Sequence, residues 1–162
     1  MAASRDMAAR SDTPAETGKR ELVITRVFDA PRALVFKAWT EPERLVLWWG
    51  PQGFTIPFCE MDVRPGGAWR VCMRGPDGTD HWVRGVYREI VEPERLAFSW
   101  AWENADGNPR EDTLVTLTFA EHGERTTLTL HHAGFATDTG RDEHHGGWAS
   151  CLERLPDYLA TA

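Results

Sequence analysis

Hydrophobic and polar residues alternate along much of the middle of the chain, as they do in half-buried β-strands. The first such segment, residues 21–29 (ELVITRVFD), is rich in β-branched and aromatic residues. Later segments are separated by turn sequences that carry Gly, Pro or Asp, and by one longer polar loop over residues 104–112. These further strands are predicted over residues 54–63, 68–74, 80–91, 95–103, 113–120 and 125–133. Short strands at regular spacing predict an antiparallel meander.

Three segments follow the helical period instead. The first helix opens at Pro31, because proline suits the first turn of a helix. A short second helix is predicted over residues 41–49 and ends before Gly50. The third, over residues 143–160, places its apolar residues on one face. Within it, Pro156 should remove a backbone hydrogen bond and kink the helix near its end.

The order is therefore one strand, two short helices, six strands and one long helix. This order predicts an α+β fold in which a curved antiparallel sheet wraps around the long C-terminal helix. A single helix cannot fill the whole interior of such a sheet, so we expect an internal cavity. Residues 20–162 should form this one domain, and residues 1–19, which lack periodicity, are expected to be a disordered N-terminal tail.

Composition narrows the possible partners. The formal net charge of −7 argues against nucleic acid, whose binding depends on Lys and Arg neutralising phosphates. No apolar run is long enough to span a bilayer. Cys59, Cys72 and Cys151 are scattered and odd in number, so we expect reduced thiols. The sequence shows no apolar leader, so the expected location is cytoplasmic. The oligomeric state, monomer or weak dimer, stays open.

The sequence offers little catalytic or metal-binding chemistry. Neighbours on a helix diverge by about 100°, so His144 and His145 do not point at one ion. His131 and His132 fall on opposite faces of a strand. No cofactor-binding fingerprint is present, so we expect neither a metal nor a cofactor. His132, if it points inward, is the strongest candidate for a polar contact or a general base in the cavity.

Several short motifs in the same order resemble one known family. They are Ala30-Pro31, Ala38-Trp39-Thr40, Trp48-Trp49-Gly50-Pro51, Asp62-Val63-Arg64-Pro65-Gly66-Gly67, Gly85 with Tyr87, Pro93-Glu94-Arg95-Leu96 and Gly147-Trp148. Together they resemble the bacterial single-domain homologues of the activator of heat-shock protein 90 ATPase, which belong to the START-related SRPBCC superfamily. The resemblance implies the helix-grip fold of the birch-pollen-allergen type. Pro156 departs from the family pattern.

Strand alternation predicts which side chains face the interior. Residues 95–103 place Phe98, Trp100 and Trp102 on one face. For residues 80–91, burying the arginines unpaired would be costly, so we expect His81, Val83 and Tyr87 to point inward. A set this rich in Trp and Tyr indicates a ligand cavity, because buried Trp and Tyr need partners for their N–H and O–H groups. The predicted ligand-binding residues are Trp48, Trp69, Met73, His81, Tyr87, Phe98, Trp100, Trp102, Leu117, His132, Trp148 and Leu152.

Three functions agree with these observations. The first is binding of an apolar or aromatic small molecule between the sheet and the C-terminal helix. The second is a cyclase or aromatase type of enzyme that uses the same cavity, with His132, Tyr87 or His81 transferring protons. The third, implied by the resemblance, is a co-chaperone-like module that activates a chaperone ATPase.

Overall fold

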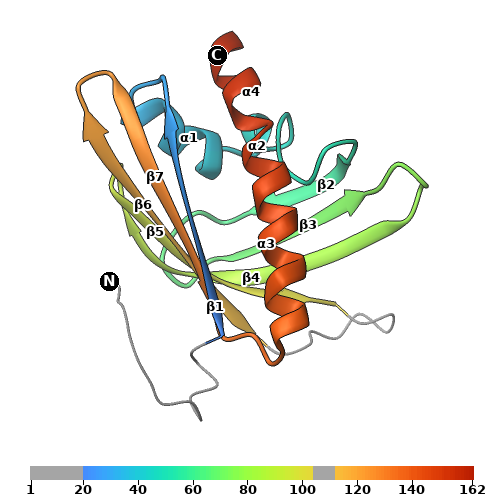
Figure 1. Cartoon of the computed structure of the whole chain (residues 1–162). Coiled ribbons are helices and arrows are strands. Elements are labelled where there is room, and N and C mark those ends of the chain that lie inside the picture. The colour runs from blue at the N-terminus through green and yellow to red at the C-terminus, as the bar shows by residue number, and fades with distance from the viewer. Residues whose placement is uncertain (1–19, 104–111) are drawn as a thin grey trace.

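The computed structural model describes residues 20–103 and 112–162, in which a long helix crosses a curved sheet (Figure 1). The elements in chain order are β1 (Glu21–Phe28), α1 (Arg32–Thr40), α2 (Pro42–Leu45), β2 (Thr55–Met61), β3 (Ala68–Arg74), β4 (Asp80–Val91), β5 (Arg95–Trp102), β6 (Thr113–His122), β7 (Arg125–Ala133), α3 (Asp138–Leu152) and α4 (Leu155–Thr161). The expected tail, residues 1–19, and nearly all of the polar loop lie outside the described residues.

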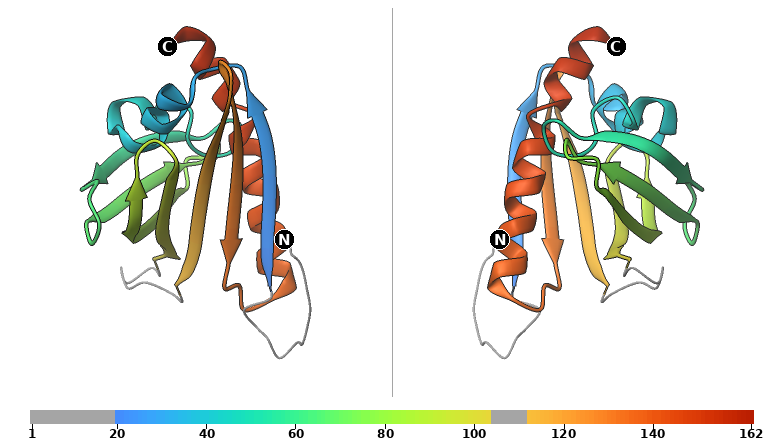
Figure 2. Two further views of the ribbon diagram at one scale, coloured as in Figure 1. Left: turned by 90° about the vertical axis from the view of Figure 1, so that its left-hand side faces the viewer. Right: turned by 90° about the vertical axis from the view of Figure 1, so that its right-hand side faces the viewer.

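The seven strands form one antiparallel sheet in the order β1-β7-β6-β5-β4-β3-β2. Consecutive strands from β2 to β7 are neighbours, as predicted for a meander, and β1 joins the sheet beside β7. Figure 2 shows α3 running alongside β1, while the sheet curves away from the helix toward β2. The predicted α+β class and its helix-grip architecture are confirmed.

The concave face of the sheet carries the apolar core. On β6 and β7, the inward residues Val115, Leu117, Leu128 and Leu130 are fully buried. The alternation seen in the sequence thus placed the inner faces of these strands correctly. Along β4, the structure buries the side chain of Val83.

Strand β4 carries apolar side chains on both faces, and the structure shows which of the two faces points inward. Tyr87 is buried on the concave side, as expected, and Trp82 lies on the convex side. There the Trp82 ring stacks under the Arg70 guanidinium at 4.0 Å and packs near Phe58. Arg70 in turn makes a bidentate ion pair with Glu103, so the convex-side arginine is paired rather than buried.

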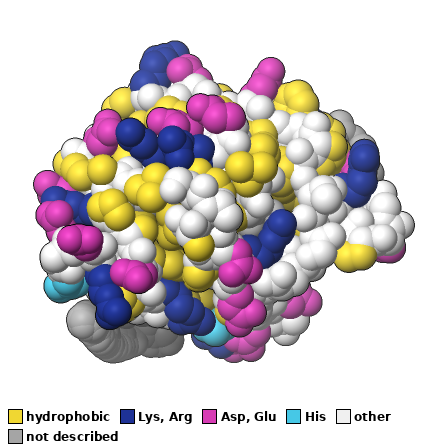
Figure 3. Space-filling model, turned by 90° about the horizontal axis from the view of Figure 1, so that it is seen from above, with side chains coloured by type: hydrophobic (Ala, Val, Ile, Leu, Met, Phe, Trp, Pro, Cys, Tyr) yellow, Lys and Arg dark blue, Asp and Glu magenta, His cyan; other side chains and the backbone are white. Residues whose placement is uncertain are grey.

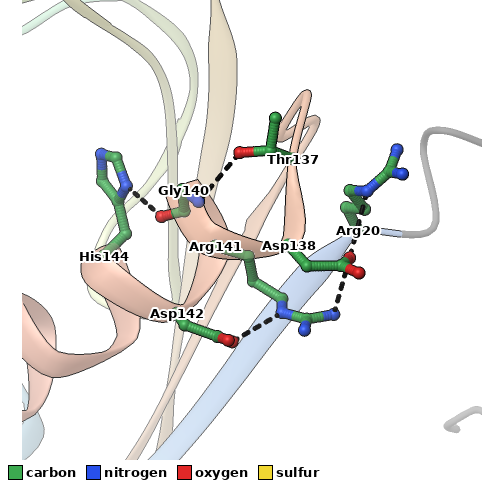
Figure 4. Close-up of polar contacts among 7 residues, drawn as sticks. All are labelled: Arg20, Thr137, Asp138, Gly140, Arg141, Asp142 and His144. Carbon is green, nitrogen blue, oxygen red and sulfur yellow. Dashed lines mark hydrogen bonds and ion pairs between the residues drawn. The ribbon is translucent and has the colours of Figure 1, made fainter.

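The helices differ from their predicted bounds at two places. The helix expected over residues 41–49 ends at Leu45, and a turn completes the segment. Helix α3 begins five residues earlier than expected, because Thr137 caps it by accepting a hydrogen bond from the Gly140 N–H (Figure 4). The expected kink is confirmed, since α3 and α4 are separate helices and Pro156 lies in the first turn of α4.

Charged side chains of both signs cover the surface. Seen from above, acidic and basic side chains surround exposed apolar ones (Figure 3). Asp62 and Arg64, beside the turn that precedes β3, form an exposed ion pair at 2.9 Å. None of the helices in the described ranges has the length and apolar character needed to cross a bilayer.

Candidate ligand-binding pocket

The adjacent tryptophans Trp48 and Trp49 face different parts of the interior. Trp48 is fully buried against α1, where its indole N–H donates to the Ala38 carbonyl at 3.2 Å. Trp49 turns toward the C-terminal helix and meets the Trp148 ring edge-on at 5.3 Å. Both rings contact Trp39 edge-on. The pair therefore joins α1, the following turn and α3 around one aromatic cluster.

This cluster fills the deep interior. Trp39 and Trp49 approach the concave side chains of the central strands, and only about 20 Å³ remains free there. That volume is close to the space one water molecule needs. Trp69, Tyr87 and Phe98 line this small void. A ligand therefore has no room at the deepest part of the curved sheet.

A much larger pocket lies between α3 and strands β3, β4 and β5. Its volume is about 450 Å³, within the range of roughly 300–1,000 Å³ that is usual for small-molecule sites. Aromatic and other apolar side chains make up most of its wall. The lining residues are Trp49, Gly50, Pro51, Met73, His81, Trp100, Trp102, Gly140, Glu143, His144, Gly147, Trp148 and Cys151.

Helix α3 contributes one continuous stripe to the pocket. Gly140, Glu143, Gly147 and Cys151 are spaced by three or four residues and so share a helix face. A methyl group added at Gly147 would meet no atom within 4 Å, which shows that the missing side chain leaves open space. Because glycine costs a helix about 1 kcal/mol relative to alanine, this glycine opens the pocket at some expense to helix stability.

A second wall is a loop held in place by Arg154, which lies between α3 and α4. Trp49, Gly50 and Pro51 belong to it, and the Nη1 of Arg154 lies 2.9–3.2 Å from the carbonyl oxygens of all three and of Phe54. A guanidinium is a pure hydrogen-bond donor, so it suits a group of carbonyl oxygens. Arg154 thereby fixes the distance between the loop and the helix, and with it the width of the pocket.

His144 is oriented by two hydrogen bonds at the pocket wall. Its Nδ1 lies 2.7 Å from the Gly140 carbonyl, and its Nε2 accepts the Trp102 indole N–H at 2.8 Å (Figure 4 shows the first contact). A carbonyl only accepts, so Nδ1 carries the proton and Nε2 is unprotonated. This tautomer joins α3 to the end of β5 across the pocket.

His132 is held in a second network, behind the pocket. It is fully buried; its Nδ1 accepts the Trp148 indole N–H at 3.0 Å, and its Nε2–H donates to the Thr113 hydroxyl at 2.6 Å. That hydroxyl donates to the Trp100 carbonyl. Burial, with smaller contributions from His144 and His131, lowers the pKa of His132 to about 2. His132 is therefore neutral near pH 7, with both ring nitrogens in use.

The structure brings five of the twelve predicted residues to the pocket. They are Met73, His81, Trp100, Trp102 and Trp148. Trp69, Tyr87 and Phe98 face inward but line the small deep void.

The remaining four, Trp48, Leu117, His132 and Leu152, line neither space. Trp48 packs on α1, whereas Leu117 and Leu152 are covered in the core. His132 lies behind the Trp148 ring, to which it is hydrogen-bonded.

Sequence reasoning missed the α3 stripe and Trp49. The signal for the stripe was present, because counting back from Gly147 by four and then three residues gives Glu143 and Gly140. Trp49 was passed over in favour of Trp48, since helical divergence shows that the two rings point apart but not which one points where.

The cysteine thiols are buried or half-buried, and the possible metal ligands of the described residues lie apart from one another. Burial raises the pKa of the Cys151 thiol to about 12 and that of Cys59 to about 11, so both stay protonated near pH 7. Burial also raises the pKa of Tyr87. Across residues 20–103 and 112–162, no three His, Cys, Asp or Glu side chains gather closely enough to hold a metal ion.

A curved antiparallel sheet that grips a C-terminal helix, with an aromatic pocket between them, defines a helix-grip protein of the SRPBCC type. The family model described as "Activator of Hsp90 ATPase homolog 1-like protein" matches residues 29–160, and the chain belongs to this family. Folds of this kind commonly bind hydrophobic ligands. A search of curated proteins gives no match.

Solved structures agree with this assignment. The chain is similar to the AHSA1 protein from Silicibacter pomeroyi, with 26% identity, a TM-score of 0.79, and coverage of 87% of this chain and 98% of the other. A protein from Chromobacterium violaceum shows 26% identity and a TM-score of 0.76 over 86% and 96% of the two chains. CalU16 from Micromonospora echinospora shows 27% identity and a TM-score of 0.67 over 86% and 75%.

Proposed function

We propose that this protein binds an apolar or aromatic small molecule in the pocket between α3 and strands β3–β5. The observation that carries the proposal is a 450 Å³ pocket walled by the indoles of Trp49, Trp100, Trp102 and Trp148. Burial of apolar ligand surface on these rings would supply most of the affinity, at about 25 cal/mol per Å² before the costs of binding.

The choice of tryptophan supports binding rather than packing alone. The indole N–H groups of Trp39, Trp49, Trp69 and Trp100 are buried and have no acceptor among the described residues. An unpaired buried donor costs about 1–3 kcal/mol, a cost that leucine or valine would avoid. Two of the four, Trp49 and Trp100, form the pocket wall. The cyclase and co-chaperone alternatives gain no comparable support from the described side chains.

The test is a titration with N-phenyl-1-naphthylamine, an uncharged dye that fluoresces strongly in apolar sites. Gly147→Leu would place a side chain in the open space of the pocket. Gly146→Leu is the matched control, because Gly146 is exposed and lies next to it on the same helix but outside the pocket.

We expect Gly147→Leu to weaken dye binding by at least about tenfold, because the leucine side chain would occupy space that the dye needs. The Gly146→Leu protein should bind like the wild type. Equal affinities in all three proteins, or no binding to the wild type by this dye or by a library of small aromatic compounds, would contradict the proposed function.

A further inference from the structure

We propose that the pocket selects ligands that carry a protonated amine on an apolar or aromatic body, and that the Glu143 carboxylate binds the ammonium group. The proposal rests on the function proposed above and names the ligand class of the same pocket. It follows from which polar groups of the wall remain available, from where Glu143 lies, and from the charges around it.

The described polar groups of the wall, which also include the His81 ring, contain one carboxylate that no described side chain pairs with. Both ring nitrogens of His144 are engaged, toward Trp102 and Gly140. The Cys151 thiol stays protonated and is a weak hydrogen-bonding group. Glu143, in contrast, makes no ion pair with any described side chain, although the pocket lies against it. A carboxylate accepts only, so its natural ligand partner is a donor, best a cationic one.

Glu143 lies where it can reach a ligand. It stands between Gly140 and Gly147 on the α3 stripe, one helical turn from each. Neither neighbour carries a side chain that would separate the carboxylate from the pocket. In an isolated helix, two glycines this close together are unfavourable. Gly147 in particular leaves open space beside Glu143, which is the only acidic residue among the described wall residues, so a ligand group can approach the carboxylate there.

The wall facing α3 suits a cation as well. Trp100 and Trp102 meet edge-on, with ring centres 5.6 Å apart and planes at 87°, and both rings line the pocket. Indole faces attract cations, and aromatic cages are a common way to bind ammonium groups. The hydrogen bond from Trp102 to His144 fixes the orientation of that ring.

The surrounding charges disfavour an anionic ligand. The described lining residues include Glu143 and no Lys or Arg. Arg141, the basic residue of α3 nearest in sequence, is bonded to Asp142 at 3.1 Å and lies 3.7 Å from Asp138. In Figure 4 this group leaves the helix on a different side from His144. The formal net charge of −7 adds a general attraction for cations.

The experiment compares three probes of one shape: 2-naphthylmethylamine, which is cationic at pH 7, 2-naphthylmethanol, which is neutral, and 2-naphthoate, which is anionic. Each is titrated into the wild type, Glu143→Gln and Glu153→Gln by calorimetry. Glu153 is a matched control, because it is an exposed acid at the end of the same helix and does not line the pocket. Both substitutions remove one negative charge.

We expect the wild type to bind the amine about tenfold or more tightly than the alcohol, and the naphthoate weakest, on the scale of one charge-assisted hydrogen bond. Glu143→Gln should remove the preference for the amine and leave the affinity for the alcohol unchanged. Glu153→Gln should keep the wild-type order.

Equal binding of amine and alcohol by the wild type, or tightest binding of the naphthoate, overturns the amine proposal and leaves the pocket function standing. Equal losses in the two variants would also overturn it, because the preference would then come from net charge rather than from contact with Glu143. If the wild type binds none of the three probes, the proposed function fails together with this inference.

Discussion

His132 should make the protein sensitive to mild acid. In the folded state its pKa is lowered from 6.5 to about 2, because the ring is buried, with smaller contributions from His144 and His131. In the unfolded chain the ring would titrate near its ordinary value. At pH values between these two pKa values, His132 is protonated in the unfolded chain and neutral in the folded protein. The stability due to neutral His132 is therefore complete above about pH 6.5 and is lost progressively as the pH falls toward 2.

The size of the effect follows from the difference between the two states. Each pH unit below the unfolded pKa costs about 1.4 kcal/mol of unfolding free energy. Lowering the pH from 7.0 to 5.0 should therefore remove about 2 kcal/mol through His132 alone. A domain of this size typically has about 5–15 kcal/mol in total, so the loss is readily measured.

Urea unfolding at the two pH values, followed by circular dichroism, measures it. The His132→Gln protein keeps a donor and an acceptor but has no group that titrates there, so its stability should fall by about 2 kcal/mol less between pH 7.0 and 5.0 than that of the wild type. His145→Gln, which changes an exposed histidine, should behave like the wild type. If wild type and His132→Gln lost the same stability, the buried neutral network would be refuted.

Three further predictions test the pocket wall and the sheet. Arg154→Ala removes the hydrogen bonds to the carbonyls of residues 49–51 and 54 and should lower the free energy of unfolding by about 1.5–3 kcal/mol, whereas an unchanged urea midpoint would show that the loop does not depend on it. Gly85→Ala should unfold or severely destabilise the protein, since its methyl group would lie 1.8 Å from the Ser99 carbonyl oxygen. Gly146→Ala, whose methyl group meets nothing within 4 Å, should raise the free energy of unfolding by about 1 kcal/mol. A thermal melt that ranks the two variants otherwise would contradict this packing. Cys151 should resist iodoacetamide at pH 8 and react once urea unfolds the chain, as followed by peptide mass spectrometry, and rapid labelling of the folded protein would disprove its burial.

Strand faces could be predicted because they depend on local alternation. In β5 the apolar residues at every second position leave one choice, and Phe98 and Trp100 are buried as expected. In β4 the cost of burying Arg84 and Arg88 decided between two faces, and Val83 and Tyr87 are the buried residues. The order of elements and the kink at Pro156 also follow from local signals.

The position of the pocket could not be predicted in the same way. Alternation shows that Trp69, Phe98 and Trp100 share the concave face, but not which part of that face is covered. In the structure Trp39 and Trp49 fill the space over Trp69 and Phe98, and the helix leaves the space beside Trp100 open. That outcome depends on sheet curvature and on how α1 and the following turn dock, which are long-range properties.

The role of His132 shows the same limit. Its inward direction was correct, because Leu128, Leu130 and His132 alternate with exposed or half-exposed residues along β7. Its partners come from β6 and α3, far away in the sequence, and they decide that it is a buried structural group. A pattern of single residues contains no information on such partners.

The most direct test of the pocket is an isotope-filtered nuclear Overhauser experiment with bound N-phenyl-1-naphthylamine. The protein is labelled with ¹³C at the methyl groups of methionine and alanine. We predict contacts from the dye to the Met73 methyl group, which lines the pocket. We predict none to Met61, which lines the deep void, and none to Ala101, which lies on the convex face. Contacts to Met61 or Ala101 without contacts to Met73 would contradict the account.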